Sequence, residues 1–228
     1  MKQVILLACL FMAAQLAAQH TQQEIKKYRI SKIVKHSVTS DAENIDKFET
    51  RFDRNGNETA IYLNEEYITK SVNQYNKAGR LTKVTGYDML GDSAETSWAV
   101  YTYNADGSYK VSALHPGHET PELMWYDKTG RLTRTLEPDK KEDIYKYDGG
   151  GKLTSVKTKP GSYGDVTDLK YSYNTKGQRS KEVSEGTYRW TRTYSYDTKG
   201  MLSKVVTVGT DEGVNTTTTD TYQYEFWK

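Results

Sequence analysis

The sequence has almost no cysteine. Its single copy, Cys9, lies in an opening segment with the order of a secretory signal peptide: a basic residue, Lys2, then an apolar stretch over residues 4–14 and small residues. We expect residues 1–19 to be removed on export, leaving residues 20–228 as one domain without a thiol. Disulfides, cysteine nucleophiles and thiolate metal sites are then excluded from that domain.

A second interpretation of the opening segment is a lipid anchor at Cys9. Residues 6–9, Leu-Leu-Ala-Cys, resemble a lipoprotein box. We rank this second, because a lipid-carrying cysteine normally follows the apolar region, whereas here that region continues past it. Either way the protein is expected to be exported, to the periplasm, the cell surface or the medium.

Long hydrophobic runs and excess charge are also lacking. Only 36% of residues are hydrophobic, the mean hydropathy is −0.82, and 32 basic side chains nearly balance 30 acidic ones. The charge balance gives no general attraction to nucleic acid. The apolar stretch is too short to span a membrane as a helix. A lipid-facing strand needs an apolar residue at every second position, whereas residues 179–182 carry charges at both alternating sets of positions. We expect no membrane-spanning segment after signal removal.

A repeated turn motif is what the chain does have. Tyr-Asn-x-x-Gly-Arg-Leu-Thr at residues 75–82 matches Tyr-Asp-x-x-Gly-Arg-Leu-Thr at residues 126–133, and looser copies follow the same order. An Asp or Asn that accepts backbone hydrogen bonds, followed three residues later by a left-handed glycine, predicts a hairpin turn with a G1 bulge. Seven glycines define the register: Gly56, Gly79, Gly107, Gly130, Gly151, Gly177 and Gly200.

Tyrosines precede the turns at every second position, as in Tyr101/Tyr103 and Tyr194/Tyr196. Side chains two apart share a face of a strand, so a tyrosine ladder should line one face of the sheet. Leu81 and Val84, three apart after the turn, do not fit that period. Either the bulge absorbs the offset or one of the two points to the opposite face.

The motif, with Tyr145-x-Tyr147-Asp148 after the return turn, resembles the YD repeats of RHS proteins over residues 52–228. The resemblance implies antiparallel hairpin strips, which in large RHS and teneurin proteins coil into a hollow shell, sometimes around a toxin domain, and have been linked to carbohydrate binding or cell contact. Seven copies are too few to enclose a domain, so we do not carry the shell function over. We predict an all-β fold: a single antiparallel β-meander of about seven hairpin repeats in an open or curled sheet.

Two tryptophans are the binding candidates. Trp98 and Trp125 have the opposite parity to Tyr103 and Tyr126, which places them on the face away from the tyrosine ladder. Flat exposed aromatic rings suit stacking on sugars. The alternative is that both pack against neighbouring strands, while Trp190 shares the parity of the tyrosines and is expected in the core.

Other candidate sites are explained by the turns themselves. His115 and His118 flank a Pro-Gly turn, but two ligands do not make a metal site. The loop after Asp53 lacks the calcium-loop pattern, because glycine falls at its fourth position. Scattered acids such as Glu65, Glu66 and Glu119 show no pairing in linear order, and we expect no catalytic residue, metal or cofactor.

The function that the sequence favours is an exported, non-enzymatic binding or surface-scaffold module, with a glycan or a surface protein as the partner. Two alternatives stay open: a hydrolase of envelope polysaccharide, and a companion of a secreted RHS-type toxin system. A pocket with two close carboxylates would favour the first, and toxin genes beside this one the second.

Overall fold

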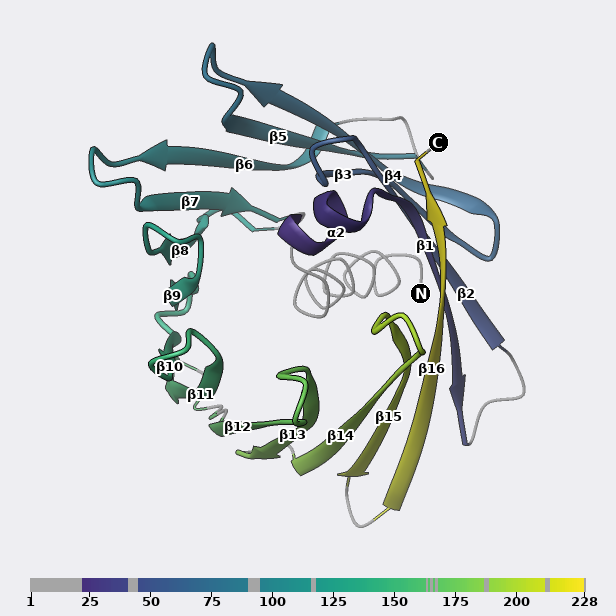
Figure 1. Cartoon of the computed structure of the whole chain (residues 1–228). Coiled ribbons are helices and arrows are strands. Elements are labelled where there is room, and N and C mark those ends of the chain that lie inside the picture. Colours follow the sequence, from purple (N-terminus) through teal and green to yellow (C-terminus); the bar gives the residue numbers. More distant parts are fainter. Residues whose placement is uncertain are drawn as a thin grey trace.

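The chain folds into a closed antiparallel β-barrel, seen along its axis in Figure 1. The computed structural model describes residues 22–40, 45–89, 95–115, 118–162, 164, 166, 168–186, 189–211 and 214–227, so Cys9 and the expected signal peptide lie outside the described residues. The elements are α2 (Gln22–Tyr28), β1 (Ile30–Thr39), β2 (Ile45–Phe52), β3 (Glu58–Leu63), β4 (Glu66–Tyr75), β5 (Leu81–Asp88), β6 (Glu95–Tyr103), β7 (Tyr109–Leu114), β8 (Glu122–Tyr126), β9 (Leu132–Leu136), β10 (Glu142–Tyr147), β11 (Leu153–Lys159), β12 (Asp168–Tyr173), β13 (Arg179–Glu185), β14 (Arg189–Tyr196), β15 (Leu202–Asp211) and β16 (Val214–Phe226).

The barrel is closed by its first and last strands. Each strand pairs with its neighbours in sequence, and β1 also pairs with β16 from Ile30↔Phe226 to Thr39↔Thr218. The prediction of antiparallel β-structure is confirmed, but the predicted open or curled sheet is wrong. Closure removes the two strand edges that an open meander would expose. Nothing local in the sequence indicates it, because the paired strands lie at opposite ends of the chain.

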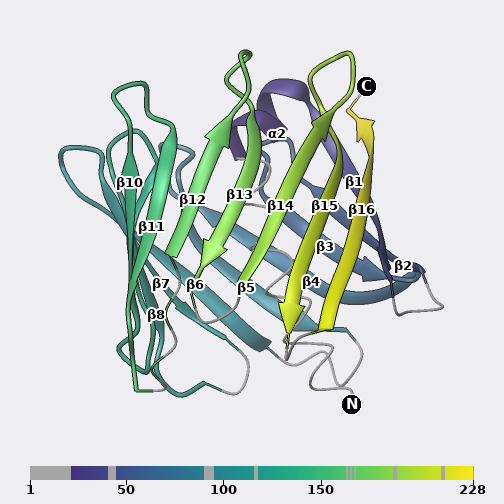
Figure 2. The same cartoon turned by 90° about the horizontal axis from the view of Figure 1, so that it is seen from below.

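The seven predicted turns are all present. Every motif glycine has a positive φ, between 73° and 88°. In each turn the glycine amide donates to the carbonyl of the motif Asp or Asn, as Gly130 does to Asp127 at 2.9 Å. Since every second hairpin connection is a motif turn, the turns gather at one end of the barrel, called here the motif rim. Figure 2 shows three of them, between β10 and β11, β12 and β13, and β14 and β15, at the same end as α2.

The motif aspartate holds its turn through its carboxylate. Asp127 Oδ1 accepts hydrogen bonds from the amides of Thr129, at 2.8 Å, and Arg131, at 3.1 Å. Burial by itself would raise the pKa of Asp127, but these bonds and those from the Thr129 and Arg131 side chains hold it at about 2. Asp or Asn therefore serves at this position because its oxygen reaches two backbone amides at once.

A bulge after the turn resolves the three-residue offset between leucine and valine. The pairing of β4 with β5 shifts between Gln74 and Tyr75, so Leu81 faces Tyr75 while Lys83 faces Gln74. Leu81 and Val84 consequently point to the same face. The β6–β7 hairpin provides the control within the chain. Its register has no shift, and there the two apolar residues, Tyr109 and Val111, are only two apart.

The motif threonine serves this bulge. Thr133 Oγ1 donates to the carbonyl oxygen of Trp125 at 3.0 Å, across the bulged position. A hydroxyl at this position therefore satisfies a carbonyl at a point where the ladder is interrupted. Hydroxyl groups at the same position of four other bulges do likewise: Thr59, Thr82, Thr154 and Ser203.

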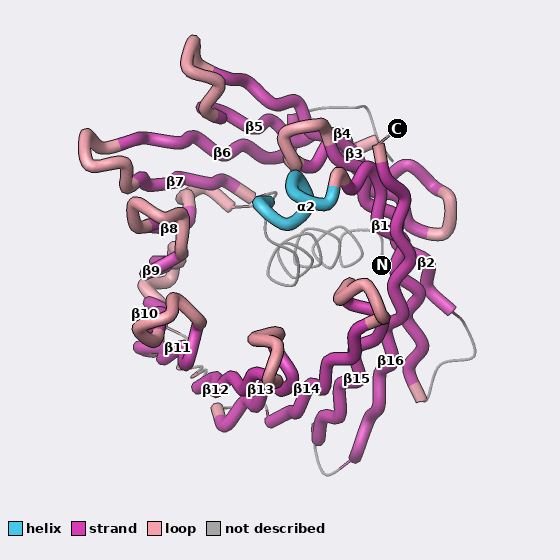
Figure 3. The backbone as a smooth tube through the Cα atoms, in the orientation of Figure 1, coloured by secondary structure: helices cyan, strands magenta, loops and turns pink. Residues whose placement is uncertain are grey.

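In several repeats the tyrosine before the turn ties its hairpin to the preceding one. The ladder between β9 and β10 ends at Arg134↔Ile144, two residues short of Leu132, and the Tyr147 hydroxyl donates to the Leu132 carbonyl at 2.6 Å. The hairpins separate toward the rim, as the turns of β4–β5 and β6–β7 do in Figure 3. The tyrosine thus replaces a backbone donor that has moved away. Four more tyrosines repeat the bond: Tyr103, Tyr173, Tyr196 and Tyr224.

The motif arginine covers the next tyrosine. The guanidinium of Arg131 lies 5.0 Å from the ring centroid of Tyr147, and that of Arg80 lies 5.3 Å from that of Tyr103. Lys152 takes the same place over Tyr173. Cation–π contacts at exposed sites are worth about 0.5–1 kcal/mol each. One tyrosine therefore contacts the preceding repeat in two ways: its hydroxyl bonds to a carbonyl there, and its ring face is covered by a cationic side chain from there.

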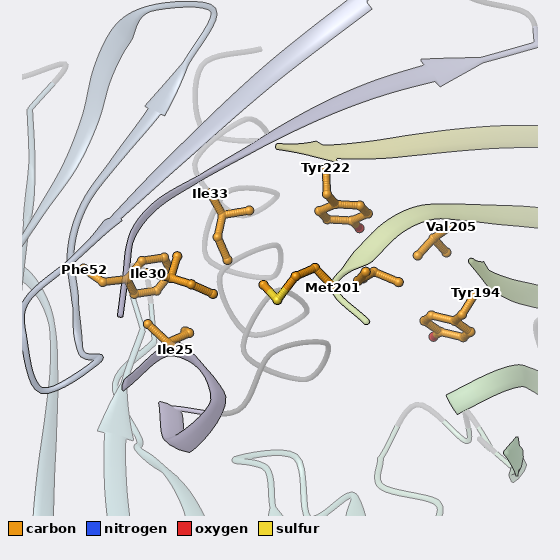
Figure 4. Packing of buried hydrophobic residues seen from close by; sticks show 9 residues of the cluster. Ile25, Ile30, Ile33, Phe52, Tyr194, Met201, Val205 and Tyr222 are labelled. Atoms are coloured by element: carbon orange, nitrogen blue, oxygen red, sulfur yellow. The ribbon is translucent and has the colours of Figure 1, made fainter. Parts of the chain in front are cut away.

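A cluster of buried hydrophobic residues lies inside the barrel where it closes. Ile25 of α2 packs with Ile30 and Phe52, and Met201 and Tyr222 extend the cluster across the lumen wall (Figure 4). The helix was not predicted from the sequence. It lies within the ring of strands, where its single buried isoleucine is covered. Among the described residues no helix is long and apolar enough to cross a membrane.

We predict that Gly130→Val lowers the free energy of unfolding by about 2 kcal/mol or more, because a β-branched residue is strained at φ +82°. No atom lies within 4 Å of a Cβ built at Gly130, so the cost is conformational. Gly149→Ala is the control, since Gly149 has equal space and is outside the left-handed region. Thermal unfolding is the measurement, and equal melting temperatures for the two variants would contradict the turn assignment.

We predict that Tyr147→Phe costs about 1–3 kcal/mol, because the Leu132 carbonyl loses its donor while the ring is kept. Tyr126→Phe is the matched control. Among the described residues its hydroxyl has only the sulfur of Met124 as acceptor, at 3.7 Å, so the loss of the hydroxyl should be nearly neutral. Urea unfolding of both variants tests the difference. Tyr126→Phe as damaging as Tyr147→Phe would show that the carbonyl tie contributes nothing special.

Candidate functional site

Trp98 and Trp125 lie on the outer wall of the barrel, as their parity predicts. In the strand register Trp98 faces Thr85 and Leu114, and Trp125 faces Lys110 and Arg134, all on the face opposite Tyr101. Lys110 and Leu114 are four residues apart on β7, so the two rings are separated by about 13 Å along the strands. The structure therefore does not bring the two tryptophans into one contact site.

Each tryptophan is partly covered. Trp98 is half-buried, and its cross-strand neighbour Thr85 is only 4% exposed. The guanidinium of Arg134 lies 4.4 Å from the ring centroid of Trp125, so one face of that ring is already stacked. What is left of each ring for a ligand is therefore less than the sequence alone implied.

The tyrosine ladder faces the lumen. Tyr109 stacks on Tyr126 with ring centroids 4.6 Å apart and planes 6° apart, and Tyr103 tilts against Tyr109 at 5.2 Å. Burial raises the pKa of Tyr109 to about 12, so its hydroxyl stays protonated at neutral pH. Trp190, which sequence parity assigned to the same face, faces Ser184 and Gly209 and carries Arg192 over its ring at 4.1 Å.

The lumen wall also carries charge. Glu182 is 5% exposed, accepts a hydrogen bond from the Tyr194 hydroxyl at 2.5 Å and lies 3.8 Å from Arg192. On the other side of the closure, Lys35 lies 3.7 Å from Asp220. Burial lowers the pKa of Lys35, although Asp220 partly offsets this. These residues pair opposite charges, although Asp220 Oδ1 is buried without a hydrogen-bond partner among the described residues.

One lumen acid differs from these pairs. Glu58 occupies the position that leucine holds in other repeats, six residues after the aromatic residue Phe52. Burial raises the pKa of its carboxyl to about 7, against a hydrogen bond from Ser71 that lowers it. This residue could have been identified from the sequence, because an alignment of the motif copies shows Glu58 at the position where most copies have leucine.

The remaining sequence candidates have structural roles. His115 Nε2 lies 3.2 Å from Glu122, and His118 meets His115 edge-on at 6.4 Å between ring centroids. In the part of the chain that the structure describes, no three or more His, Cys, Asp and Glu residues gather as a metal site would require. Asp53 Oδ1 accepts from the amides of Asn55 and Asn57, which is its turn role. Glu65 pairs with Lys47 at 3.0 Å.

Three solved structures illustrate the likeness to other proteins. A porin-like protein from Bacteroides uniformis is 12% identical with a TM-score of 0.45, and the match covers 86% of this chain and 98% of that one. TcdB2-TccC3 without its hypervariable C-terminal region is 20% identical with a TM-score of 0.35, covering 78% of this chain and 10% of that one. TcdB2-TccC3 with Cdc42 is 12% identical with a TM-score of 0.32, covering 72% and 12%. This chain thus spans only about a tenth of the toxin-complex chains.

Comparison with protein families gives a broader match. No curated protein matches the sequence. The family model described as Teneurin YD-shell matches residues 9–223, which include all seven motif turns and fifteen complete strands. The turns, the tyrosine ties and this match agree on one assignment: the chain belongs to the Teneurin YD-shell family.

Proposed function

We propose that this protein is an exported, non-enzymatic scaffold whose outer wall presents a binding surface for a glycan or a surface protein. The observation that carries the proposal is the use of the motif residues. Tyrosine, aspartate, glycine, arginine and threonine all bond within the barrel, so the repeats build a wall rather than a reaction centre. Membership of a shell family supports a structural role.

The chemistry of the outer wall supports exposure to water. Glu142 on β10 lies between Arg134 of β9 and Lys159 of β11, with its carboxylate 2.7 Å from the lysine nitrogen. A hydrogen bond from Lys159, with a second from Arg134, lowers the pKa of Glu142. Lys170 and Glu185 pair on the same wall. Lipid-facing strands place apolar residues at these outward positions, so we propose that this wall does not span a membrane.

The partner class follows from what the outer wall offers. Trp98 and Trp125 are its large aromatic rings on β6 and β8, and Arg134 and Lys110 lie beside Trp125. A ring flanked by hydrogen-bond donors suits a sugar with several hydroxyl or carboxyl groups. A role beside a secreted toxin also fits a shell family, and toxin genes next to this one would favour it.

A hydrolase is less well supported. It would need two carboxylates at a catalytic separation, and Glu58 is the acid with a raised pKa among the described residues. Its shift arises from burial, with Ser71 as the one opposing contact and no contribution from a second acid. We therefore keep Glu58 out of a catalytic role.

We predict that a glycan or surface-protein ligand bound by the exported protein loses about tenfold or more in affinity with Trp98→Ala or Trp125→Ala. Glycan-array binding followed by titration of the best ligand is the measurement. Trp190→Phe is the control, since that ring faces the lumen and should leave binding unchanged. Binding that ignores both outer substitutions, or that responds only to the lumen variant, would remove the outer wall as the site.

A pH dependence follows from Glu58. Its pKa is about 7 in the folded protein against an ordinary 4.5, so folding favours the protonated acid. This contribution is complete below about pH 4.5 and is lost as the pH rises through 7, at a cost of up to about 3 kcal/mol. Glu58→Gln should remove this part of the decline between pH 5 and pH 8 in thermal unfolding. Parallel curves for the two proteins would contradict the shift.

A further inference from the structure

A hollow lies in the lumen wall where β3 to β7 adjoin. The cross-strand partners Ile33, Thr50, Ile61 and Thr69 share one face, and Ile33 belongs to the lumen core, so the face is the inner one. The hollow has a volume of about 170 Å³. Its inner-face lining includes Glu58, Thr69, Ser71, Gly86, Ser97 and Ala99.

Small side chains make the hollow. Gly86 on β5 faces Ser97 on β6, and a Cβ at Gly86 would lie 2.2 Å from Ser97 Oγ. Ala99 and Ala113 are direct cross-strand partners on the next pair of strands. On the same face nearer the rim, Tyr101 and Tyr109 fill the wall. Among the described residues of β5 to β7, the small inward-facing side chains therefore gather at this part of the lumen wall.

The polar groups of the hollow are rich in hydrogen-bond acceptors. Thr69 is 8% exposed, and its Oγ1 is buried without a hydrogen-bond partner among the described residues. Beside the hollow, but not among its lining residues, Asn73 donates from its side-chain nitrogen to the backbone carbonyl oxygen of Glu58, and its own Oδ1 is buried without a partner among the described residues. A buried oxygen left without a hydrogen bond destabilises the folded protein, and a bound donor would recover that free energy.

Two charged residues, Glu58 and Arg179, stand at the motif position that leucine holds in other repeats. Arg179 has an oppositely charged residue nearby, whereas no charged partner among the described residues contributes to the pKa of Glu58. The guanidinium of Arg179 lies 4.7 Å from the ring centroid of Tyr171. Burial acts to lower the pKa of this guanidinium, and nearby groups that include Glu182 raise it. In the described part of the chain, the Glu58 carboxyl has the neutral hydroxyl of Ser71 as its side-chain hydrogen-bond partner. His115 also lines the hollow, but its Nε2 is directed to Glu122 at 3.2 Å.

We propose that this hollow binds a small organic molecule through a primary ammonium group, held by the Glu58 carboxylate and the Thr69 hydroxyl. An ammonium brings three donors and a positive charge to a site of acceptors with one uncompensated acid. The apolar part of the molecule lies against Gly86, Ala99 and Ala113. A cavity of about 150 Å³ accommodates a benzene-sized molecule, so a single six-membered ring is the expected size. Trp98 and Leu114, which face outward, also contribute to the lining of the hollow, but Glu58 and Thr69 lie on its inner face.

Cyclohexylammonium chloride and cyclohexanol are the matched probes, because they share a ring and differ in the charged group. Titration calorimetry of the exported protein at pH 8, where Glu58 is ionised, should show saturable binding of the ammonium. Cyclohexanol should bind at least tenfold more weakly, as expected when a charge-assisted hydrogen bond is lost. Equal binding of the two probes, or no binding of the ammonium, would overturn the proposal without any variant.

Three variants locate the site. Glu58→Gln keeps the shape and removes the charge, and should weaken ammonium binding at least tenfold. Thr69→Val should weaken it about fivefold, the effect of one neutral hydrogen bond. Glu66→Gln is the control, because Glu66 is an exposed acid on β4 next to the same hairpin, and it should bind as the unchanged protein does. Undiminished binding by Glu58→Gln, or an equal loss with Glu66→Gln, would place the ammonium elsewhere.

Discussion

The barrel depends on one bond, from the hydroxyl of a motif tyrosine to a carbonyl of the preceding hairpin. The pairing between neighbouring hairpins ends before the motif rim, so the carbonyl of a residue such as Leu132 has no partner on the adjacent strand of the next hairpin. A tyrosine side chain is long enough to reach this carbonyl, as the Tyr147 hydroxyl does at 2.6 Å. A phenylalanine has no hydroxyl and cannot donate the hydrogen bond. Five tyrosines of the described chain make this bond, in a sequence that has 19 tyrosines and 4 phenylalanines. Its core residue must be both an apolar ring and a donor.

The other motif positions serve the same junction. Aspartate and glycine form the turn, threonine satisfies the carbonyl at the bulge, and arginine covers the tyrosine of the next repeat. With these roles filled, the positions that depart from the motif become informative. Glu58 and Arg179 stand where leucine is expected. Arg179 lies over the ring of Tyr171 with the opposite charge of Glu182 nearby. Glu58 instead lines a hollow whose inner face carries small residues.

Local features of the fold could be predicted from the sequence, and distant ones could not. A turn is determined by five consecutive residues, so Gly130 and its six counterparts were identifiable, and period two placed Trp98 and Trp125 on the outer wall. Closure depends on Ile30 meeting Phe226, and no motif marks either residue. Helix α2 has a single buried isoleucine, Ile25, too little for a periodic signal. The hollow near Glu58 is lined by residues of five strands, β3 to β7, so its shape could be seen only in the structure.

The closure between β1 and β16 has a consequence for how the chain folds. Fifteen of the sixteen strand pairs join neighbours in sequence and need only short loops to form, whereas the last pair joins residues nearly two hundred positions apart. Loop-closure entropy grows with length, so this pair is favoured only once the hairpins between have ordered and brought the ends together. Until then β1 and β16 are two free edges of complementary register. At high concentration the β16 edge of one molecule is a template for the β1 edge of another, which makes strand exchange the characteristic route to misassembly.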